Sequence, residues 1–198
     1  MSPNRDWGYD VSNYVEVDPA LGTLADADEL IEQAARRGIR VVLDLVPNHT
    51  SDQHPWFLDA RSSRDSAHRD WYVWADPKPD GSPPNNWVNT FDPGATAWTF
   101  DEHTGQYYMN NFLPTQPDLN WWNEEVREAF DDVLRFWFAR GIAGFRIDVC
   151  HAIIKDRELR DDPAPTPDDH PLIRKKGHKQ MFSMNRPEVH DVLRRWRA

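Results

Sequence analysis

The 198-residue sequence contains one cysteine, Cys150, and lacks any long apolar run. A single thiol excludes an intrachain disulfide, and we expect a reducing, cytoplasmic environment. No segment has the pattern of a signal peptide, and none reaches the roughly 20 apolar residues that a membrane span needs. Basic residues are in the minority, 23 Lys and Arg against 33 Asp and Glu, which gives a formal net charge of -10. This excess of negative charge argues against nucleic acid or an anionic membrane as a partner.

Two short apolar segments that carry charged side chains are the most informative features present. Residues 39–45 (IRVVLDL) form an almost continuous aliphatic run that includes Asp44, which is typical of a parallel strand covered on both faces. Residues 144–149 (GFRIDV) alternate, with Arg146 and Asp148 on one side and apolar residues on the other. A buried guanidinium and carboxylate so close together form a structural ion pair or do chemistry, and this segment alone leaves both interpretations open.

An amphipathic helix is predicted before each of these strands. Residues 24–37 carry apolar side chains at helical spacing and follow a possible N-cap, Thr23; residues 126–138 do the same after Asn123. The order helix, strand, excursion, helix, strand is that of a parallel α/β sheet, in which reacting groups gather beyond the carboxyl ends of the strands. The polar residues predicted at those ends are Asp44, His49, Arg146 and Asp148.

Four motifs occur in a fixed order along the chain. They are SPNRDWGYD at 2–10, DLVPNHTSDQHPWF at 44–57, QPDLNW at 116–121 and GFRIDV at 144–149. Together they resemble the α-amylase superfamily, glycoside hydrolase family 13. Within it they are most similar to the α-glucosidase and oligo-1,6-glucosidase branch, for which a QPDLN segment is typical.

The resemblance implies an α/β fold that is part of a (β/α)8 TIM barrel, from the loop after strand two to helix four. An irregular domain would be inserted after strand three. We therefore expect barrel segments at residues 1–49 and 118–198, with the inserted domain B at residues 50–117. The chain is expected to be an internal piece of the catalytic domain, with poor stability or association in isolation, because open barrel edges expose apolar faces.

The resemblance also implies a retaining mechanism, in which one carboxylate attacks the anomeric carbon and another carboxyl group protonates the leaving oxygen. Asp148 matches the family's nucleophile and Arg146 matches its partner. The family's general acid, a glutamate on strand five, would lie beyond Ala198. We therefore expect residues 1–198 alone to have no turnover.

Further positions carry over as substrate-binding residues by the same resemblance. His49 matches a histidine that hydrogen-bonds the sugar, Asp6 and Tyr9 match a pair that grips the terminal glucose, and Phe112 matches an aromatic wall. The complete set of expected substrate-binding residues is Asp6, Tyr9, Asp44, His49, Phe112 and Gln116. Without the resemblance, these residues would be assigned to loop capping or ordinary core.

Neither a metal nor a cofactor is predicted. Asn48 resembles a calcium ligand of α-amylases, but the α-glucosidase branch generally lacks that ion, and no acidic cluster offers a replacement.

Two stretches between the motifs give weaker predictions. The excursion between the two predicted strands, residues 50–117, is rich in aromatic residues. We expect most of them to form the core of a small domain that overhangs and shortens the substrate pocket. Residues 156–179 hold four prolines and many charges, which predicts a solvated, flexible surface loop without helix through its middle.

Three functional hypotheses follow. The leading one is an α-glucosidase-type hydrolase acting on a small oligosaccharide or disaccharide through a covalent glucosyl-aspartate. The second is a transglucosylase or isomerase of the trehalose synthase or sucrose isomerase type, which shares that intermediate and differs in the acceptor. The third is a non-catalytic carbohydrate-binding relative, and the presence of Asp148 beside Arg146 counts against it.

Overall fold

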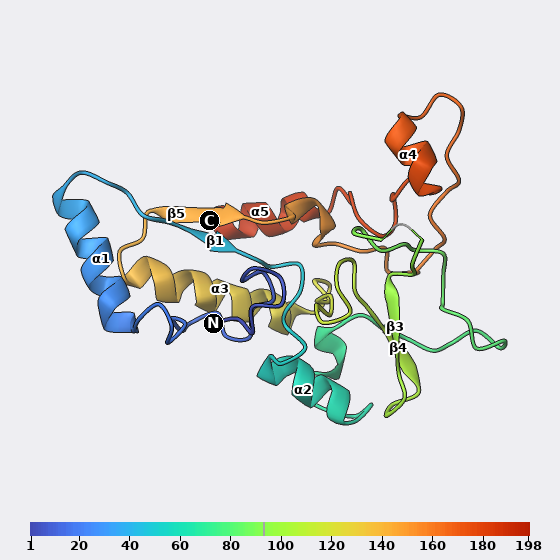
Figure 1. Ribbon diagram of the computed structural model, residues 1–198, viewed down its shortest axis with the longest axis horizontal. Coiled ribbons are helices and arrows are strands. Elements are labelled where there is room, and N and C mark those ends of the chain that lie inside the picture. The colour runs from blue at the N-terminus through green and yellow to red at the C-terminus, as the bar shows by residue number, and fades with distance from the viewer. Residues whose placement is uncertain (93) are drawn as a thin grey trace.

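The computed structural model describes residues 1–92 and 94–198, and the chain is elongated with two unlike ends (Figure 1). One end holds a parallel pair of strands and two long helices; the other holds a small antiparallel sheet. At the first end lie α1 (Leu24–Arg36), β1 (Val42–Leu45), α3 (Glu124–Ala139) and β5 (Gly144–Ile147). No helix within the described ranges has both the length and the apolarity required to cross a bilayer.

The two long helices begin where the sequence predicts. The Thr23 hydroxyl accepts a hydrogen bond from the Asp26 backbone N–H, and the Asp26 carboxylate accepts one from the Thr23 backbone N–H, which together form a capping box. Asn123 caps α3 by accepting from the Glu125 N–H at 2.9 Å. The apolar stripe of α3 buries Val126, Phe130, Val133, Leu134 and Trp137. These helices thus follow directly from cap residues and apolar periodicity.

β1 and β5 pair in parallel, and Asp44 faces Arg146 in the register. Both strands are shorter than predicted and less covered than the aliphatic pattern of residues 39–45 implied. Val42 is 56% exposed, and the Arg146 side chain is also 56% exposed. The prediction of a strand covered on both faces is therefore wrong for this structure, because the pair has no further strand beside it in the described residues.

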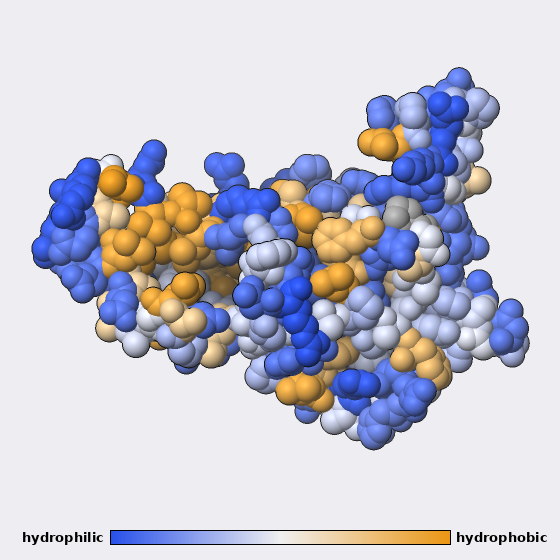
Figure 2. Space-filling view, viewed as in Figure 1, coloured by the Kyte–Doolittle hydropathy of each residue, from blue (hydrophilic) through white to orange (hydrophobic). Residues whose placement is uncertain are grey.

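An apolar area next to α1 is correspondingly open to solvent (Figure 2). A groove of about 610 Å³ is lined by apolar side chains of the strands and α3, which include Leu43, Leu45, Val133, Trp137 and Phe145.

The excursion between the strands forms its own small sheet. β2 (Trp74–Ala75), β4 (Gln106–Met109) and β3 (Trp98–Asp101) lie in that order and are antiparallel. Trp87 and Trp98 stack at 5.8 Å in its core, which bears out the expectation that the aromatic residues are mainly structural. Helix α2 (Pro55–Ser62) belongs to the same excursion, and Phe57 on it packs into the core that also contains α3.

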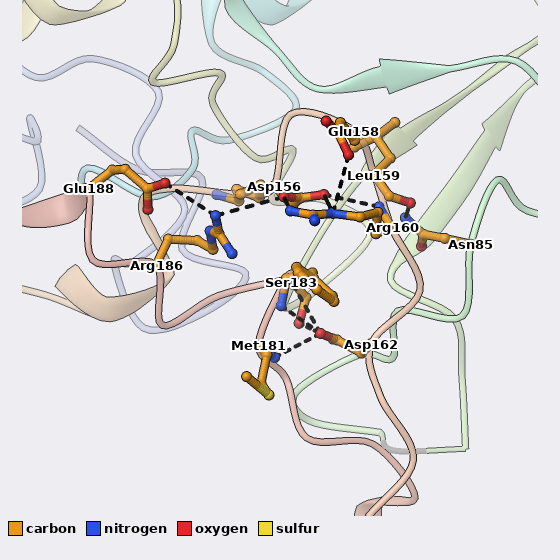
Figure 3. Close-up of polar contacts among 12 residues, drawn as sticks. Asn85, Asp156, Glu158, Leu159, Arg160, Asp162, Met181, Ser183, Arg186 and Glu188 are labelled. Atoms are coloured by element: carbon orange, nitrogen blue, oxygen red, sulfur yellow. Dashed lines mark hydrogen bonds and ion pairs between the residues drawn. The ribbon is translucent and has the colours of Figure 1, made fainter.

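Most of residues 156–179 are exposed or half-buried, as predicted for a solvated surface tract, but two side chains, Asp156 and Asp162, are buried. Asp162 is only 2% exposed, and its carboxylate accepts from the Met181 and Phe182 backbone N–H groups and from the backbone N–H and hydroxyl of Ser183 (Figure 3). The α4 helix (Pro171–Lys176) forms within the tract and stands away from the body (Figure 1). The sequence pattern missed this anchoring because single side-chain-to-backbone bonds leave no periodicity. The prolines do keep the stretch before Pro171 out of helix, as predicted.

A short 3₁₀ turn, η2 (Cys150–Ala152), lies between β5 and this tract, and the chain finishes in α5 (Val189–Arg197). Val192 on it is 1% exposed and joins the core that contains α3.

His54, at the start of α2, packs its imidazole ring against the core that also contains α3. The ring is neutral in this buried position. Its Nδ1 accepts a hydrogen bond from the Trp56 backbone N–H at 3.1 Å and so caps α2. The ring is 4% exposed and lies 4.2 Å from the Trp56 ring and 5.6 Å from the Tyr14 ring, centroid to centroid. Burial lowers the pKa of His54 to about 3, because an imidazolium would lose its hydration there.

We predict that the chain loses stability through His54 as the pH falls below about 6.5, the ordinary histidine pKa. The unfolded chain binds a proton at this position that the folded chain excludes, so the free energy of unfolding falls by up to about 2 kcal/mol by about pH 5. His54→Asn retains a capping oxygen and removes the titration. Urea unfolding should therefore show a smaller acid-induced loss in H54N than in the wild type.

His103→Asn removes an exposed histidine and provides the matched control. H103N should retain the whole wild-type difference between neutral and acid conditions. An H54N variant with the same acid-induced loss as the wild type would contradict the assignment.

A second prediction concerns the anchor of the loop after β5. Asp162→Ala leaves buried N–H groups without an acceptor, which should lower the free energy of unfolding by about 2–4 kcal/mol. Asp168→Ala removes an exposed carboxylate from the same loop and should change it by less than about 0.5 kcal/mol. Equal urea midpoints for D162A and D168A would show that the loop is not held by this carboxylate.

Candidate active site

Arg146 joins two carboxylates at the carboxyl ends of the paired strands. Its Nη1 lies 2.8 Å from Asp44 Oδ2, 3.0 Å from Asp44 Oδ1 and 2.8 Å from Asp148 Oδ1. Asp44 comes from β1, Arg146 from β5, and Asp148 follows β5 directly, so the parallel register creates the cluster. The hydrogen bond to Asp44 and the charges of both aspartates raise the pKa of Arg146. Two carboxylates share one guanidinium, which leaves the cluster with a net negative charge.

The backbone turns sharply at the candidate nucleophile. The Asp148 N–H donates to the Leu45 carbonyl at 2.8 Å, which is the last bond between the two strands. Val149 then adopts φ 38° and ψ 40°, the left-handed region that a β-branched residue occupies only under strain. The predicted strand through Val149 therefore ends at Ile147. The Asp148 side chain is 15% exposed, so the turn leaves a mostly buried carboxylate with an open edge.

The loop at residues 2–10 brings Tyr9 to this cluster. Asp10 is fully buried and organises the loop, because its carboxylate accepts from the Ser2 hydroxyl and from the Arg5 and Asp6 backbone N–H groups. The Tyr9 hydroxyl donates to Asp44 Oδ2 at 3.2 Å. The negative charge of Asp44 raises the pKa of Tyr9, so this phenol stays a donor.

His49 contacts the backbone of the same loop. Its Nε2 lies 3.0 Å from the Tyr9 carbonyl oxygen, and its Nδ1 lies 3.0 Å from Asn48 Nδ2. An amide nitrogen is a donor, so Nδ1 accepts and the proton sits on Nε2, which donates to Tyr9. Burial lowers the pKa of His49, which is consistent with this neutral tautomer. The Phe112 ring packs at 5.3 Å from the imidazole.

Gln116 and Asp6 form a second contact at the same end of the molecule. Gln116 is fully buried, its Nε2 donates to Asp6 Oδ2 at 2.8 Å, and its Oε1 accepts from the Leu113 N–H at 3.0 Å. The eight predicted site residues thus fall into two sets of contacts, which are joined by the Tyr9 backbone N–H donating to the Asp6 carbonyl at 2.8 Å. One branch runs Asp148, Arg146, Asp44, Tyr9, His49, Phe112; the other is Asp6 with Gln116.

A buried ion pair beneath the site was not predicted. Lys155 is 3% exposed, and its ammonium lies 2.8 Å from Asp118 Oδ2 and donates to Asn48 Oδ1 at 2.7 Å. Asp118 is fully buried and also accepts from the Asn111 N–H and side-chain amide. Burial lowers the pKa of Lys155, and the neighbouring carboxylate opposes that effect. A lysine directly after the apolar run 152–154, together with an aspartate inside the QPDLNW motif, was the available signal.

This ammonium bears on the prediction of no metal. Asn48 Oδ1 is the oxygen that the resemblance associates with calcium, and Lys155 already donates to it. The contact supports the prediction that Asn48 binds no metal. For the site as a whole, the absence of a metal stays a prediction.

The parallel strands, their flanking helices and the carboxylates at the strand ends have the design of part of a TIM-barrel enzyme. A family model described as "Alpha amylase, catalytic domain" matches residues 1–198. The chain is 53% identical over 203 aligned residues to a probable alpha-glucosidase of Rhizobium meliloti (strain 1021), covering 100% of this chain and 36% of that protein. It is 49% identical over 164 residues to an oligo-1,6-glucosidase of Heyndrickxia coagulans, covering 83% of this chain and 29% of that protein.

A solved structure of an alpha-glucosyl transfer enzyme matches with a TM-score of 0.92 at 44% identity, over 100% of this chain and 38% of that one. The chain therefore belongs to the α-amylase catalytic-domain family, and its resemblance to the α-glucosidase and oligo-1,6-glucosidase members is confirmed. It spans about a third of the length of these relatives.

The buried pair gives a testable prediction. Lys155→Met leaves the Asp118 carboxylate buried without a counter-charge and should lower the free energy of unfolding by about 3–5 kcal/mol. Adding Asp118→Asn should restore part of that loss, since a neutral amide needs no counter-ion. Lys175→Met on the exposed face of α4 should have almost no effect. Additive losses in the K155M/D118N double variant would refute the coupling.

Proposed function

We propose that residues 1–198 supply the nucleophile and the terminal-glucose pocket of a retaining α-glucoside hydrolase, within a longer (β/α)8 barrel. The single observation that carries this proposal is the Asp44–Arg146–Asp148 cluster at the carboxyl ends of adjacent parallel strands. In this assignment β1 and β5 are barrel strands three and four, and residues 50–117 are the inserted domain. The open apolar face beside α1 would then be covered by the rest of the barrel.

In the proposed mechanism the Asp148 carboxylate attacks the anomeric carbon of a bound α-glucoside and forms a β-glucosyl ester as the bond to the leaving oxygen breaks. Arg146 orients the attacking oxygen through its 2.8 Å contact. Asp44 anchors the guanidinium from the other side, and the Tyr9 hydroxyl in turn holds Asp44. Water then cleaves the ester and releases glucose with retained configuration.

The remaining residues are proposed to bind the terminal glucose. Tyr9 offers its ring to the apolar sugar face, and Asp6, aimed by the buried Gln116, accepts from a sugar hydroxyl. Phe112 closes one wall beside His49. Because the His49 Nε2–H already donates to the Tyr9 carbonyl, its proposed bond to the sugar has to be shared with that contact.

The proton donor for the leaving group is assigned to a residue outside residues 1–198. Asp44 is unsuited to that role because Arg146 and Tyr9 both donate to it. The relatives are about three times longer than this chain, so a further carboxyl group has room elsewhere in such a protein. The proposed substrate is a short α-linked oligosaccharide or disaccharide, and the single thiol favours a cytoplasmic location.

Glucosyl transfer is the second candidate, because an alpha-glucosyl transfer enzyme matches this chain with a TM-score of 0.92. Transfer and hydrolysis share the glucosyl-aspartate and differ only in the acceptor. Incubating the full-length enzyme with maltose, isomaltose or sucrose separates them: hydrolysis yields only free monosaccharides, whereas transfer yields a new disaccharide or a longer product.

The proposal predicts that Asp148→Asn lowers kcat of the full-length enzyme by at least about 10³-fold, because an amide cannot form the glucosyl ester. A mechanism-based fluorinated α-glucoside should add one glucosyl group to the wild type, and peptide mass spectrometry should locate it on Asp148. Asp132→Asn on the exposed face of α3 is the matched control and should leave kcat unchanged. A label on any other residue, or an active D148N variant, would overturn the assignment.

A further inference from the structure

We propose that a groove separate from Asp148 binds a neutral saccharide. The groove encloses about 550 Å³, within the range of ligand sites, and it is bordered by residues 70–74, 120–123 and 155–159. Asp156 and Leu159 of its third border are labelled in Figure 3. Its lining in the described chain includes none of the eight residues assigned to the candidate active site.

Trp122 gives the groove an aromatic wall. Its indole N–H donates to the Lys155 carbonyl oxygen at 2.8 Å, so the ring has a fixed orientation while the side chain stays partly exposed. The Arg157 guanidinium lies 4.4 Å from the ring centroid. The guanidinium therefore lies over one face of the indole. The C–H face of a sugar ring would pack on the outer surface of this pair, where the guanidinium N–H groups can donate to its hydroxyls.

The groove presents one carboxylate and one guanidinium whose polar atoms are available to a ligand, although the guanidinium also stacks on Trp122. The side chains of Asp70 and Arg157 are exposed, and neither has a hydrogen bond or ion pair with the described residues. The other charged groups are already used: Lys155 is buried against Asp118, and Asp156 is buried against Arg160. One free charge of each sign favours a neutral polyhydroxyl ligand over an anion or a cation.

The Asp70 side of the groove is held in place before any ligand binds. The side-chain amides of Asn120 and Asn123 both donate to the Asp70 backbone carbonyl, at 2.9 and 3.3 Å. These bonds tie the short 3₁₀ turn η1 (Arg69–Trp71) to the segment that precedes α3. A wall fixed in this way loses little conformational entropy on binding, which favours measurable affinity from few contacts.

The test is a maltotriose titration followed by saturation-transfer NMR, which does not depend on turnover. Tyr9→Ala removes the proposed aromatic platform and should weaken binding at the active site. The part of the remaining binding that is lost on changing groove residues then reports a second site. Adding Asp70→Ala and Arg157→Ala to Y9A should weaken that binding about tenfold, equivalent to about 1.4 kcal/mol. Adding Asp65→Ala and Arg174→Ala, two exposed charges outside the groove lining, should leave it unchanged. Sorbitol, a neutral polyol without a ring to pack on the Trp122–Arg157 pair, is the control ligand and should show no saturable binding.

Two results would overturn the proposal. One is the absence of saturable maltotriose binding in Y9A. The other is equal affinity of Y9A and the Y9A/D70A/R157A variant, which would place the second site elsewhere. Circular dichroism of each variant checks that the fold is intact. Arg157→Gln alone is a milder change at the same rim, with an expected smaller loss of affinity.

Discussion

The parallel register of β1 and β5 is the constraint on which the site depends. It sets Asp44 opposite Arg146, residues 102 positions apart in the chain, and leaves Asp148 one step past the strand end. Side chains alternate along a strand, so a slip of one residue would turn Arg146 to the opposite face and dissolve the cluster. The strained turn at Val149 follows from the same geometry, because the chain leaves the sheet immediately after Asp148.

A second layer of contacts, beneath the strand ends, holds the loops whose positions the strand pairing does not determine. The buried Lys155 ammonium joins Asp118 and Asn48, and Asn48 in turn sets the tautomer of His49, which holds the Tyr9 carbonyl. Polar groups in this layer are desolvated, so each of these contacts offsets part of the cost of burying its two partners. Loops from three parts of the chain are thereby placed around one carboxylate.

Sequence reasoning reached the helices, the parallel pairing and the residues that meet at the site, because apolar periodicity, cap residues and four ordered motifs all leave local marks. It missed the anchoring of residues 156–179 by Asp162 and the Lys155–Asp118 pair. Each of these depends on one side chain meeting a distant partner in a buried position, and composition gives no sign of which charged residue that will be. It also overstated the burial of Arg146. The residues of one strand do not show how many further strands lie beside it, and those neighbours decide how much of the strand is covered.

The sequence by itself determined the family and predicted which groups react, because the chemistry of a carboxylate and its arginine partner resides in residue type and spacing. Only the tertiary structure decided which atoms touch. It showed that Arg146 contacts two aspartates and that His49 is neutral with its proton on Nε2. It also showed that the Lys155 ammonium donates to Asn48 Oδ1. Such contacts join positions far apart in the chain, so they are set by how the segments pack around a shared low-dielectric interior.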